Sequence, residues 1–144
     1  MTNEAKTHIG VYGICRDPKG RLLLVRISGG PDKGNWVLPG GGIEWGEDPK
    51  SALIREMEEE TGITDIRSFA IRDTYSHPYS ASEYNHYTAM HHLGILYELE
   101  IGSFTLRDEE DGTTDHCEWF SEQDARALPL APLGAFAIKL VWDK

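Results

Sequence analysis

The alternation of apolar and polar positions along the chain predicts several strands around one central helix. Residues 9–16 (IGVYGICR) alternate loosely and predict a strand, and residues 17–20 (DPKG) predict a turn that pairs it with the next strand as a hairpin. That next strand, residues 21–27 (RLLLVRI), is almost continuously apolar, which is typical of a strand covered on both faces. Further strands are predicted at residues 36–38, 66–75, 87–101 and 117–120.

A helical pattern follows Pro49, which fits the first turn of a helix. Leu53, Ile54 and Met57 are expected to form its buried face, and Gly62 is expected to end it. Shorter helical patterns cover residues 122–128 and 133–142. Because the elements do not repeat as β-α-β units, we expect the α/β (α+β) class, in a single domain of residues 1–144, and not a doubly wound sheet.

The net charge of −10 argues against two broad classes of partner. A chain this acidic is poorly suited to a nucleic-acid backbone or to an anionic membrane surface, and we expect neither partner. A phosphate substrate would need a cation to reverse the local field. The first residues show no apolar signal segment, and Cys15 and Cys117 form no C-x-x-C motif. We therefore expect a cytoplasmic protein with reduced thiols.

Residues 56–60 (EMEEE) concentrate negative charge on the predicted central helix, shortly after three consecutive glycines. At about 100° per residue, Glu56, Glu59 and Glu60 fall in one arc of about 100° beside the apolar face, whereas Glu58 points away and is expected to be solvated. Carboxylates on one helix face suit Mg²⁺ or Mn²⁺. A short acidic run is more often a solvated stripe, so the run alone leaves both interpretations open.

The longer stretch around this run carries a specific motif. Gly41, five residues, Glu47, seven residues and then residues 55–63 (REMEEETGI) resemble the Nudix box, written G-x5-E-x7-R-E-U-x-E-E-x-G-U with U a bulky aliphatic residue, at every specified position. The approach to it, residues 35–47 (NWVLPGGGIEWGE), also looks like that of the family. The resemblance implies an α/β/α sandwich with a mixed central sheet, in which the box forms a loop–helix–loop.

The same resemblance implies the activity. Nudix enzymes are hydrolases of phosphorus-containing acid anhydrides, and the resemblance implies Mg²⁺-dependent hydrolysis, with Mn²⁺ as a substitute, of a nucleoside diphosphate linked to another group X. Water attacks phosphorus and releases a nucleoside monophosphate and phosphorylated X. The expected partner is therefore a small-molecule nucleotide. A homodimer is frequent in the family, which is an analogy only.

The resemblance also implies roles for individual box residues. Glu56, Glu59 and Glu60 match the metal ligands and the catalytic carboxylates, and the carbonyl of Gly40 matches a frequent further ligand. Supporting roles fall to the box glycine and to an ion pair that ties the loop to the helix; these residues are Gly41, Glu47 and Arg55.

The general base is left open by the sequence. Glu59 or Glu56 is one choice, and a carboxylate from another loop is the other. Many relatives carry a glutamate three residues before the tryptophan that opens the late strand, but His116 stands in that place before Trp119. The alternatives are the histidine itself, near neutral pH, or an acid of the same loop, namely Glu110, Asp111 or Asp115.

The substrate is less specified than the chemistry. Pro78 follows Ile63 by 15 residues, an offset that resembles a pattern of the ADP-ribose-cleaving branch, and we favour an ADP-ribose or nucleotide-sugar substrate; an ordinary loop proline is the alternative interpretation. Other candidate contacts are Arg26, Tyr79, Asp115 and His116. The alternatives are a MutT-like nucleoside triphosphate pyrophosphohydrolase, a non-catalytic nucleotide sensor, and an isoprenoid diphosphate isomerase, whose cysteine motif is not found here.

Four histidines cluster in the sequence, and their spacing fits no structural zinc pattern. Adjacent residues on a strand point to opposite faces, so His91 and His92 are not expected to share a ligand. We interpret the group as surface or pocket residues; its members are His77, His86, His91 and His92.

Overall fold

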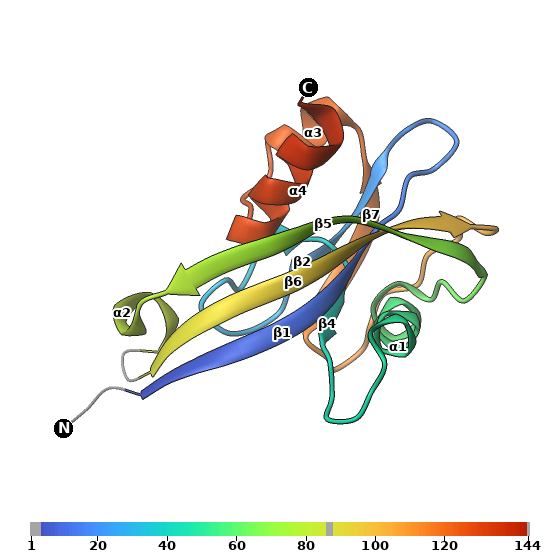
Figure 1. The fold of residues 1–144 in the computed structure, drawn as a ribbon. Coiled ribbons are helices and arrows are strands. Elements are labelled where there is room, and N and C mark those ends of the chain that lie inside the picture. The colour runs from blue at the N-terminus through green and yellow to red at the C-terminus, as the bar shows by residue number, and fades with distance from the viewer. Residues whose placement is uncertain (1–3, 86–87, 144) are drawn as a thin grey trace.

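The structure is a computed structural model that describes residues 4–85 and 88–143 (Figure 1). The strands are β1 (Glu4–Ile14), β2 (Leu22–Ile27), β3 (Trp36–Val37), β4 (Gly40–Gly42), β5 (Ile66–Tyr79), β6 (Thr88–Ile101) and β7 (Thr114–Phe120). The helices are α1 (Pro49–Thr61), α2 (Ala81–Tyr84), α3 (Glu122–Arg126) and α4 (Pro132–Trp142). No helix in these ranges is long and apolar enough to cross a membrane.

The strands form two sheets. The first has the order β4-β1-β6-β5 and is mixed, since β1 and β6 run parallel while β4 and β5 pair antiparallel with their neighbours. The second has the order β3-β2-β7 and is antiparallel. The predicted α/β (α+β) class with a mixed sheet is confirmed.

The predicted hairpin of the first two strands is wrong beyond its turn. The chain does turn back at residues 17–20, where Arg16 and Leu22 form an antiparallel bridge and the Leu23 N–H donates to the Cys15 carbonyl at 3.1 Å. Both edges of β1 are occupied by β4 and β6, however, so β2 enters the second sheet.

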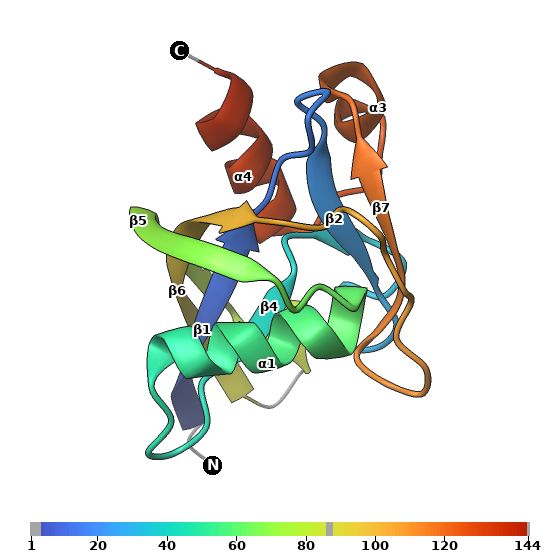
Figure 2. The same ribbon diagram turned by 90° about the vertical axis from the view of Figure 1, so that its right-hand side faces the viewer.

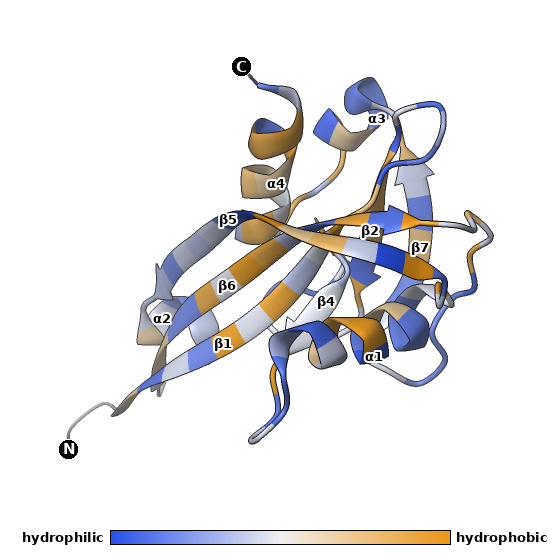
Figure 3. Ribbon diagram, turned by 45° about the vertical axis from the view of Figure 1, so that its right-hand side comes forward, coloured by the Kyte–Doolittle hydropathy of each residue, from blue (hydrophilic) through white to orange (hydrophobic). Residues whose placement is uncertain are grey.

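The helices α1 and α4 lie on opposite sides of the sheets (Figures 1 and 2). Each covers its own core: Leu53 and Met57 of α1 belong to one buried cluster, and Leu133 and Ile138 of α4 belong to the other. The strand β2 serves both clusters, with Leu22 and Leu24 on the α4 side and Leu23 and Val25 on the α1 side. Its predicted coverage on both faces is therefore confirmed, and α4 is mostly hydrophobic whereas α1 is amphipathic (Figure 3).

Several predicted boundaries shift. The first strand begins earlier, at Glu4, because its N-terminal half pairs along β6. The strand β5 continues to Tyr79 and β7 begins at Thr114, so each is longer than the apolar pattern suggested. The predicted first residue of β6, Tyr87, lies outside the described residues. The helix α1 begins at Pro49 and is followed by Gly62 at φ 76°, as predicted.

Candidate functional site

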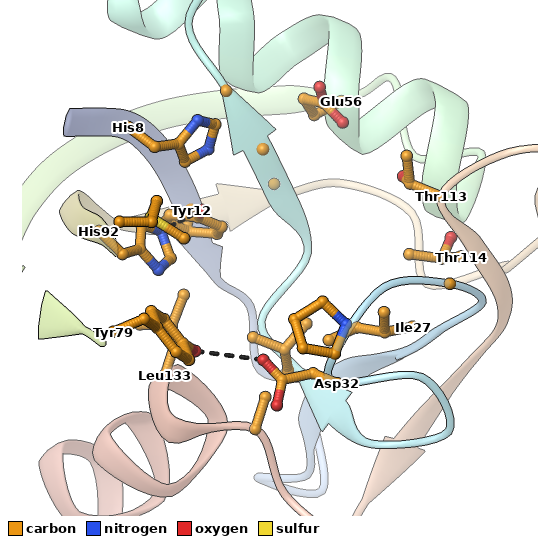
Figure 4. A pocket seen from close by; sticks show the side chains of 18 of the residues that line it. His8, Tyr12, Ile27, Asp32, Glu56, Tyr79, His92, Thr113, Thr114 and Leu133 are labelled. Atoms are coloured by element: carbon orange, nitrogen blue, oxygen red, sulfur yellow. Dashed lines mark hydrogen bonds between the residues drawn. The ribbon is translucent and has the colours of Figure 1, made fainter. Parts of the chain in front are cut away.

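A pocket of about 350 Å³ lies where β1, β4 and α1 meet the loop between β2 and β3 (Figure 4). One part of its wall is acidic and combines Glu56 and Glu60 of α1 with the three glycines of β4. The other part is built mainly of aromatic, imidazole and aliphatic side chains around one carboxylate, Asp32. Among the described residues that line the pocket there is no lysine or arginine.

The buried face of α1 is rotated from the predicted one. Leu53 and Met57 are buried as expected, but Ile54 is 43% exposed, so its predicted burial is wrong. Glu60 is only 2% exposed and lies within the buried face, not beside it. Its Oε1 accepts a hydrogen bond of 2.7 Å from the Gly40 N–H, which anchors the helix on β4. Glu58 is exposed, as predicted.

The glycines of β4 allow the helix to approach this closely. A Cβ atom at Gly41 would lie 2.7 Å from Glu56 Oε1, closer than a real Cβ contact. Gly40 has φ 142°, and a Cβ atom there would collide with the Val11 carbonyl. The contact between α1 and β4 therefore requires glycine at position 41, and the contact between β4 and β1 requires it at position 40.

Replacing Gly41 with alanine is expected to lower the affinity for a divalent cation and the turnover by about 10-fold or more, because the new Cβ displaces the Glu56 carboxylate. The fold should persist, since the colliding atoms end a flexible side chain. Gly102→Ala is the matched control, because its Cβ also meets side-chain ends, those of Asp65 and Arg67, on a distant surface. Steady-state kinetics against Mg²⁺ concentration measure the effect, and equal losses in both variants would contradict it.

Arg55 links the loop after β4 to the acidic face of α1. Its Nε and Nη2 donate to the two oxygens of Glu47 at 3.0 and 2.9 Å, which is the ion pair expected from the sequence. Its Nη1 donates to Glu56 Oε1 at 3.0 Å and lies 3.6 Å from Glu59 Oε2. The Arg55 guanidinium lowers the pKa of Glu47 to about 2, so this carboxylate stays charged.

Burial and neighbouring carboxylates raise the pKa of Glu60 and of Glu56. Burial, followed by the charges of Glu56, Glu109 and Glu59, raises the pKa of Glu60 well above its usual range. Burial also raises the pKa of Glu56, against the opposing effect of Arg55. A site that collects this much negative charge in a partly desolvated place favours a bound cation.

Glu109 is a functional candidate that sequence reasoning missed. It lies in the loop between β6 and β7, and its charge acts on both Glu56 and Glu60. The Thr114 N–H and hydroxyl donate to Glu109 Oε1 at 3.1 and 2.9 Å and hold the carboxylate in place. Nothing in the sequence distinguished it, because residues 108–111 (DEED) are consecutive acids on an aperiodic loop.

The donor set fits a hard divalent cation. Among the described residues, no three His, Cys, Asp or Glu side chains form a ready-made metal site. Magnesium does not require one, since it is usually held by one or two carboxylates, water and substrate phosphate. One oxygen each of Glu56 and Glu60 is engaged, by Arg55 and by Gly40 respectively. Glu59 is 47% exposed at the side chain and extends the acidic face toward solvent.

The far wall of the pocket holds polar groups among apolar ones. The Tyr79 hydroxyl donates to Asp32 Oδ2 at 3.1 Å, the interaction drawn in Figure 4. The Tyr12 hydroxyl lies 2.6 Å from His92 Nε2. Burial, and then the charge of His8, lower the pKa of His92 to about 4, so its imidazole is neutral at pH 7.

Several predicted substrate contacts are not among the residues that line this pocket. Arg26 and Asp115 pair with each other at 2.7 Å, and His116 lies 3.0 Å from Asp108 and 3.2 Å from Glu118. Pro78 was predicted in a loop, which is wrong: it lies exposed in the edge strand β5, where a proline costs no interior ladder bond. In the part of the chain that the structure describes, Tyr79 is the one predicted substrate contact that lines the pocket.

The clustered histidines separate as predicted for adjacent strand positions. His92 lines the pocket, whereas His91 is exposed and bonds the Ser76 hydroxyl at 2.8 Å. His77 packs against Tyr79 with ring centroids 4.4 Å apart. His86 lies outside the described residues.

Comparisons with known proteins identify a family and several relatives. A family model described as NUDIX domain matches residues 6–141. An 8-oxo-dGTP diphosphatase from Proteus vulgaris is 34% identical over 79 residues, 55% of this chain and 70% of that protein. An ADP-ribose pyrophosphatase from Bacillus subtilis is 33% identical over 116 residues, 73% of this chain and 63% of that protein.

Other relatives match over shorter segments. An RNA pyrophosphohydrolase from Saccharophagus degradans is 45% identical over 58 residues, but the match spans 40% of this chain and only 32% of that relative. Among solved structures, a MutT NUDIX hydrolase from Burkholderia pseudomallei superposes with a TM-score of 0.78 at 27% identity, covering 94% of this chain and 98% of that one. The chain spans about a third of the Saccharophagus degradans relative and 63% of the Bacillus subtilis one.

Proposed function

The chain belongs to the NUDIX domain family, and from that premise we propose that it hydrolyses the diphosphate bond of a nucleoside diphosphate linked to a group X, with Mg²⁺ or Mn²⁺ as cofactor. The observation that carries this proposal is the pairing of a buried carboxylate, Glu60, with Glu56 at one end of a pocket whose described lining contains no cationic side chain. Such a surface repels phosphate unless a cation neutralises it.

We assign the box residues as follows. Glu56, Glu59 and Glu60 would hold the cation, together with the carbonyl of Gly40. A bound cation polarises phosphate oxygens and makes water easier to deprotonate. Arg55 positions the acidic face, because it holds Glu56 and the loop carboxylate Glu47 at the same time. The N–H of Gly40 fixes Glu60, so the glycine strand positions the carboxylates as well as admitting the phosphate.

We assign the general base to Glu109. It is not held by Arg55 in the described structure, and the two Thr114 donors occupy Oε1, which orients the carboxylate beside the acidic face. Its role would be to accept the proton of the water that attacks phosphorus. His116 and Asp115 are less suitable, since each is engaged in an ion pair, whereas Glu109 has none in the described structure and its charge acts on Glu56 and Glu60.

Two forms of substrate fit the proposal. The relatives include an ADP-ribose pyrophosphatase and an 8-oxo-dGTP diphosphatase, so a nucleotide linked to a sugar and a nucleoside triphosphate are both candidates. The offset of Pro78 favoured the first, but this residue is exposed in β5 and is not among the residues that line the pocket. We therefore propose the reaction without choosing X.

The test is turnover of a panel of nucleoside diphosphate and triphosphate compounds with Mg²⁺, with the products identified by chromatography. We expect release of a nucleoside monophosphate from at least one compound, and none in the presence of a chelator. Tight nucleotide binding without turnover of any compound would overturn the hydrolase and favour a nucleotide sensor.

We also propose a cytoplasmic location. Cys15 and Cys117 are both buried and unpaired, which fits a reducing compartment. A homodimer remains a prediction from the family alone.

A further inference from the structure

The far wall of the pocket has the composition of a site for a planar, uncharged group. Tyr12, Tyr79 and His92 contribute aromatic rings to its lining, and Met90 and Leu133 add apolar surface. Asp32 is the carboxylate in this wall (Figure 4). An anionic phosphate is not favoured beside Asp32, so the part of a substrate that reaches this end is its base or another neutral group.

Asp32 is held in place and aimed at the pocket. It lies on the loop between β2 and β3, and the Tyr79 hydroxyl of β5 donates to its Oδ2 at 3.1 Å. This bond joins two segments 47 residues apart and spans the pocket wall. A hydroxyl that donates to a carboxylate leaves further lone pairs free to accept, because an ionised carboxylate has about four acceptor sites.

A second polar group in the same region has no partner. Tyr75 is only 6% exposed, and its buried hydroxyl makes no hydrogen bond within the described residues. The ring of Tyr75 packs edge-on against His92, with centroids 5.4 Å apart. Burial, and then the charge of Asp32, raise the pKa of Tyr75 to about 12, so this group remains an O–H donor. Tyr75 is not among the residues that line the pocket, so we assign this hydroxyl no contact with the base.

These groups match one class of nucleobase better than the others. A carboxylate accepts two adjacent N–H groups side by side, which is the arrangement at N1 and N2 of guanine. Adenine places an acceptor beside its amino group, and uracil places a carbonyl on each side of its single N–H, so both would set an acceptor against Asp32.

We propose that Asp32 is a specificity residue that reads the N1–H and N2–H₂ edge of a guanine base, so that the enzyme acts on guanine nucleotides. This inference rests on the proposed function for the reaction, but it concerns the end of the pocket that the reaction does not use. Tyr79 acts as a positioning residue, since it orients the carboxylate through its hydroxyl.

Binding of nucleoside monophosphates tests this without any hydrolysis. Titration calorimetry in Mg²⁺ with the guanine, hypoxanthine, adenine and uracil monophosphates should show the guanine compound binding about 10-fold or more tightly than the others, as expected for a paired contact. Hypoxanthine is the sharpest comparison, because it lacks only the N2 amino group. Equal affinity for guanine and hypoxanthine monophosphates would overturn the inference.

Three variants test whether Asp32 produces the preference for guanine. In Asp32→Asn the guanine preference should disappear, while the affinity for the uracil compound should be unchanged or higher. In Tyr79→Phe the preference should shrink, but the ranking should remain. Asp73→Asn is the control, because Asp73 is exposed and accepts from its neighbour Thr74 outside the pocket lining. A guanine preference that survives in Asp32→Asn would overturn the inference.

Turnover separates this inference from the proposed function. Guanine-selective binding with no hydrolysis of any compound would overturn the hydrolase and leave the base site standing. Hydrolysis of guanine, adenine and uracil compounds with equal kcat/KM would uphold the hydrolase and overturn the role of Asp32.

Discussion

Replacing Glu60 with glutamine is expected to lower kcat by more than about 100-fold. Mutation of a residue that only supports a metal ligand already lowers metal affinity or activity by about 10- to 100-fold, and a ligand itself should matter more. The same change should leave the metal-free protein at least as stable as the wild type. Glutamine keeps an oxygen that accepts from the Gly40 N–H, and it removes a charge from a position that is 2% exposed. Few substitutions separate function from stability so cleanly.

The stability difference between Glu60→Gln and the wild type should change with pH in a defined direction. Burial and neighbouring carboxylates raise the pKa of Glu60 in the folded state above its ordinary value of 4.5. The protonated form therefore stabilises the fold below about pH 4.5, and this contribution is lost as the pH rises through the folded-state pKa. Between pH 4.5 and the folded-state pKa of Glu60, the free energy of unfolding of Glu60→Gln should therefore rise relative to that of the wild type. Both are measured by denaturant unfolding in the presence of a chelator. Titration of His8 and His92 occurs in both proteins and cancels in the difference.

Glu58→Gln is the control for this experiment. Glu58 lies in the same acidic run but is exposed, so its kcat and its stability should stay close to those of the wild type. Equal activity of Glu60→Gln and Glu58→Gln would show that burial in the pocket wall gives Glu60 no catalytic importance.

Replacing Glu109 with glutamine is expected to lower kcat by about 100-fold to 10,000-fold with little change in KM, the range over which general bases act. Glutamine retains an acceptor for the N–H and hydroxyl of Thr114, so the loop between β6 and β7 should keep its conformation. The variant loses the proton acceptor without losing the support around it. Single-turnover kinetics would separate the chemical step from substrate binding.

His116→Asn is the matching test of the alternative base. Both ring nitrogens of His116 are engaged, by Asp108 and by Glu118, so the kcat of this variant should stay within a few-fold of the wild type. Side-chain hydrogen bonding to Asp108 raises the pKa of His116. The wild type should therefore lose some stability as the pH rises through the folded-state pKa of His116, and His116→Asn should not show this loss. A large fall in kcat for His116→Asn, with normal turnover of Glu109→Gln, would exchange the two assignments.

The acidic face of α1 was predictable because it depends on local geometry. The spacing of Glu56, Glu59 and Glu60 gives one arc on any α-helix, and Pro49 and Gly62 mark the ends of the helix within the sequence itself. The rotation of the helix on the sheet was not predictable, because it depends on how closely α1 approaches the glycines of β4. That approach buries Glu60 and leaves Ile54 exposed.

Contacts between segments far apart in the sequence also could not be predicted from sequence patterns. Glu109 joins the acidic end through a loop without periodicity, and Asp32 joins the far wall through a bond to Tyr79 across 47 residues. The partition of β1 and β2 into separate sheets depends in the same way on which strands occupy the edges of β1. His116, by contrast, was singled out by its distance from Trp119, and the fold places it outside the pocket lining.

The central claim is that the buried end of the pocket is a cation site formed by Glu56 and Glu60. The melting temperature of the wild type and of Glu60→Gln, measured against Mg²⁺ or Mn²⁺ concentration at pH 8 without nucleotide, tests it most directly. Binding to the folded state alone adds about 2.7 kcal/mol at 100 times the dissociation constant, so the wild-type melting temperature should rise with metal, whereas that of Glu60→Gln should start as high or higher and respond much less. Identical rises in the two proteins, or no rise in either, would contradict the claim.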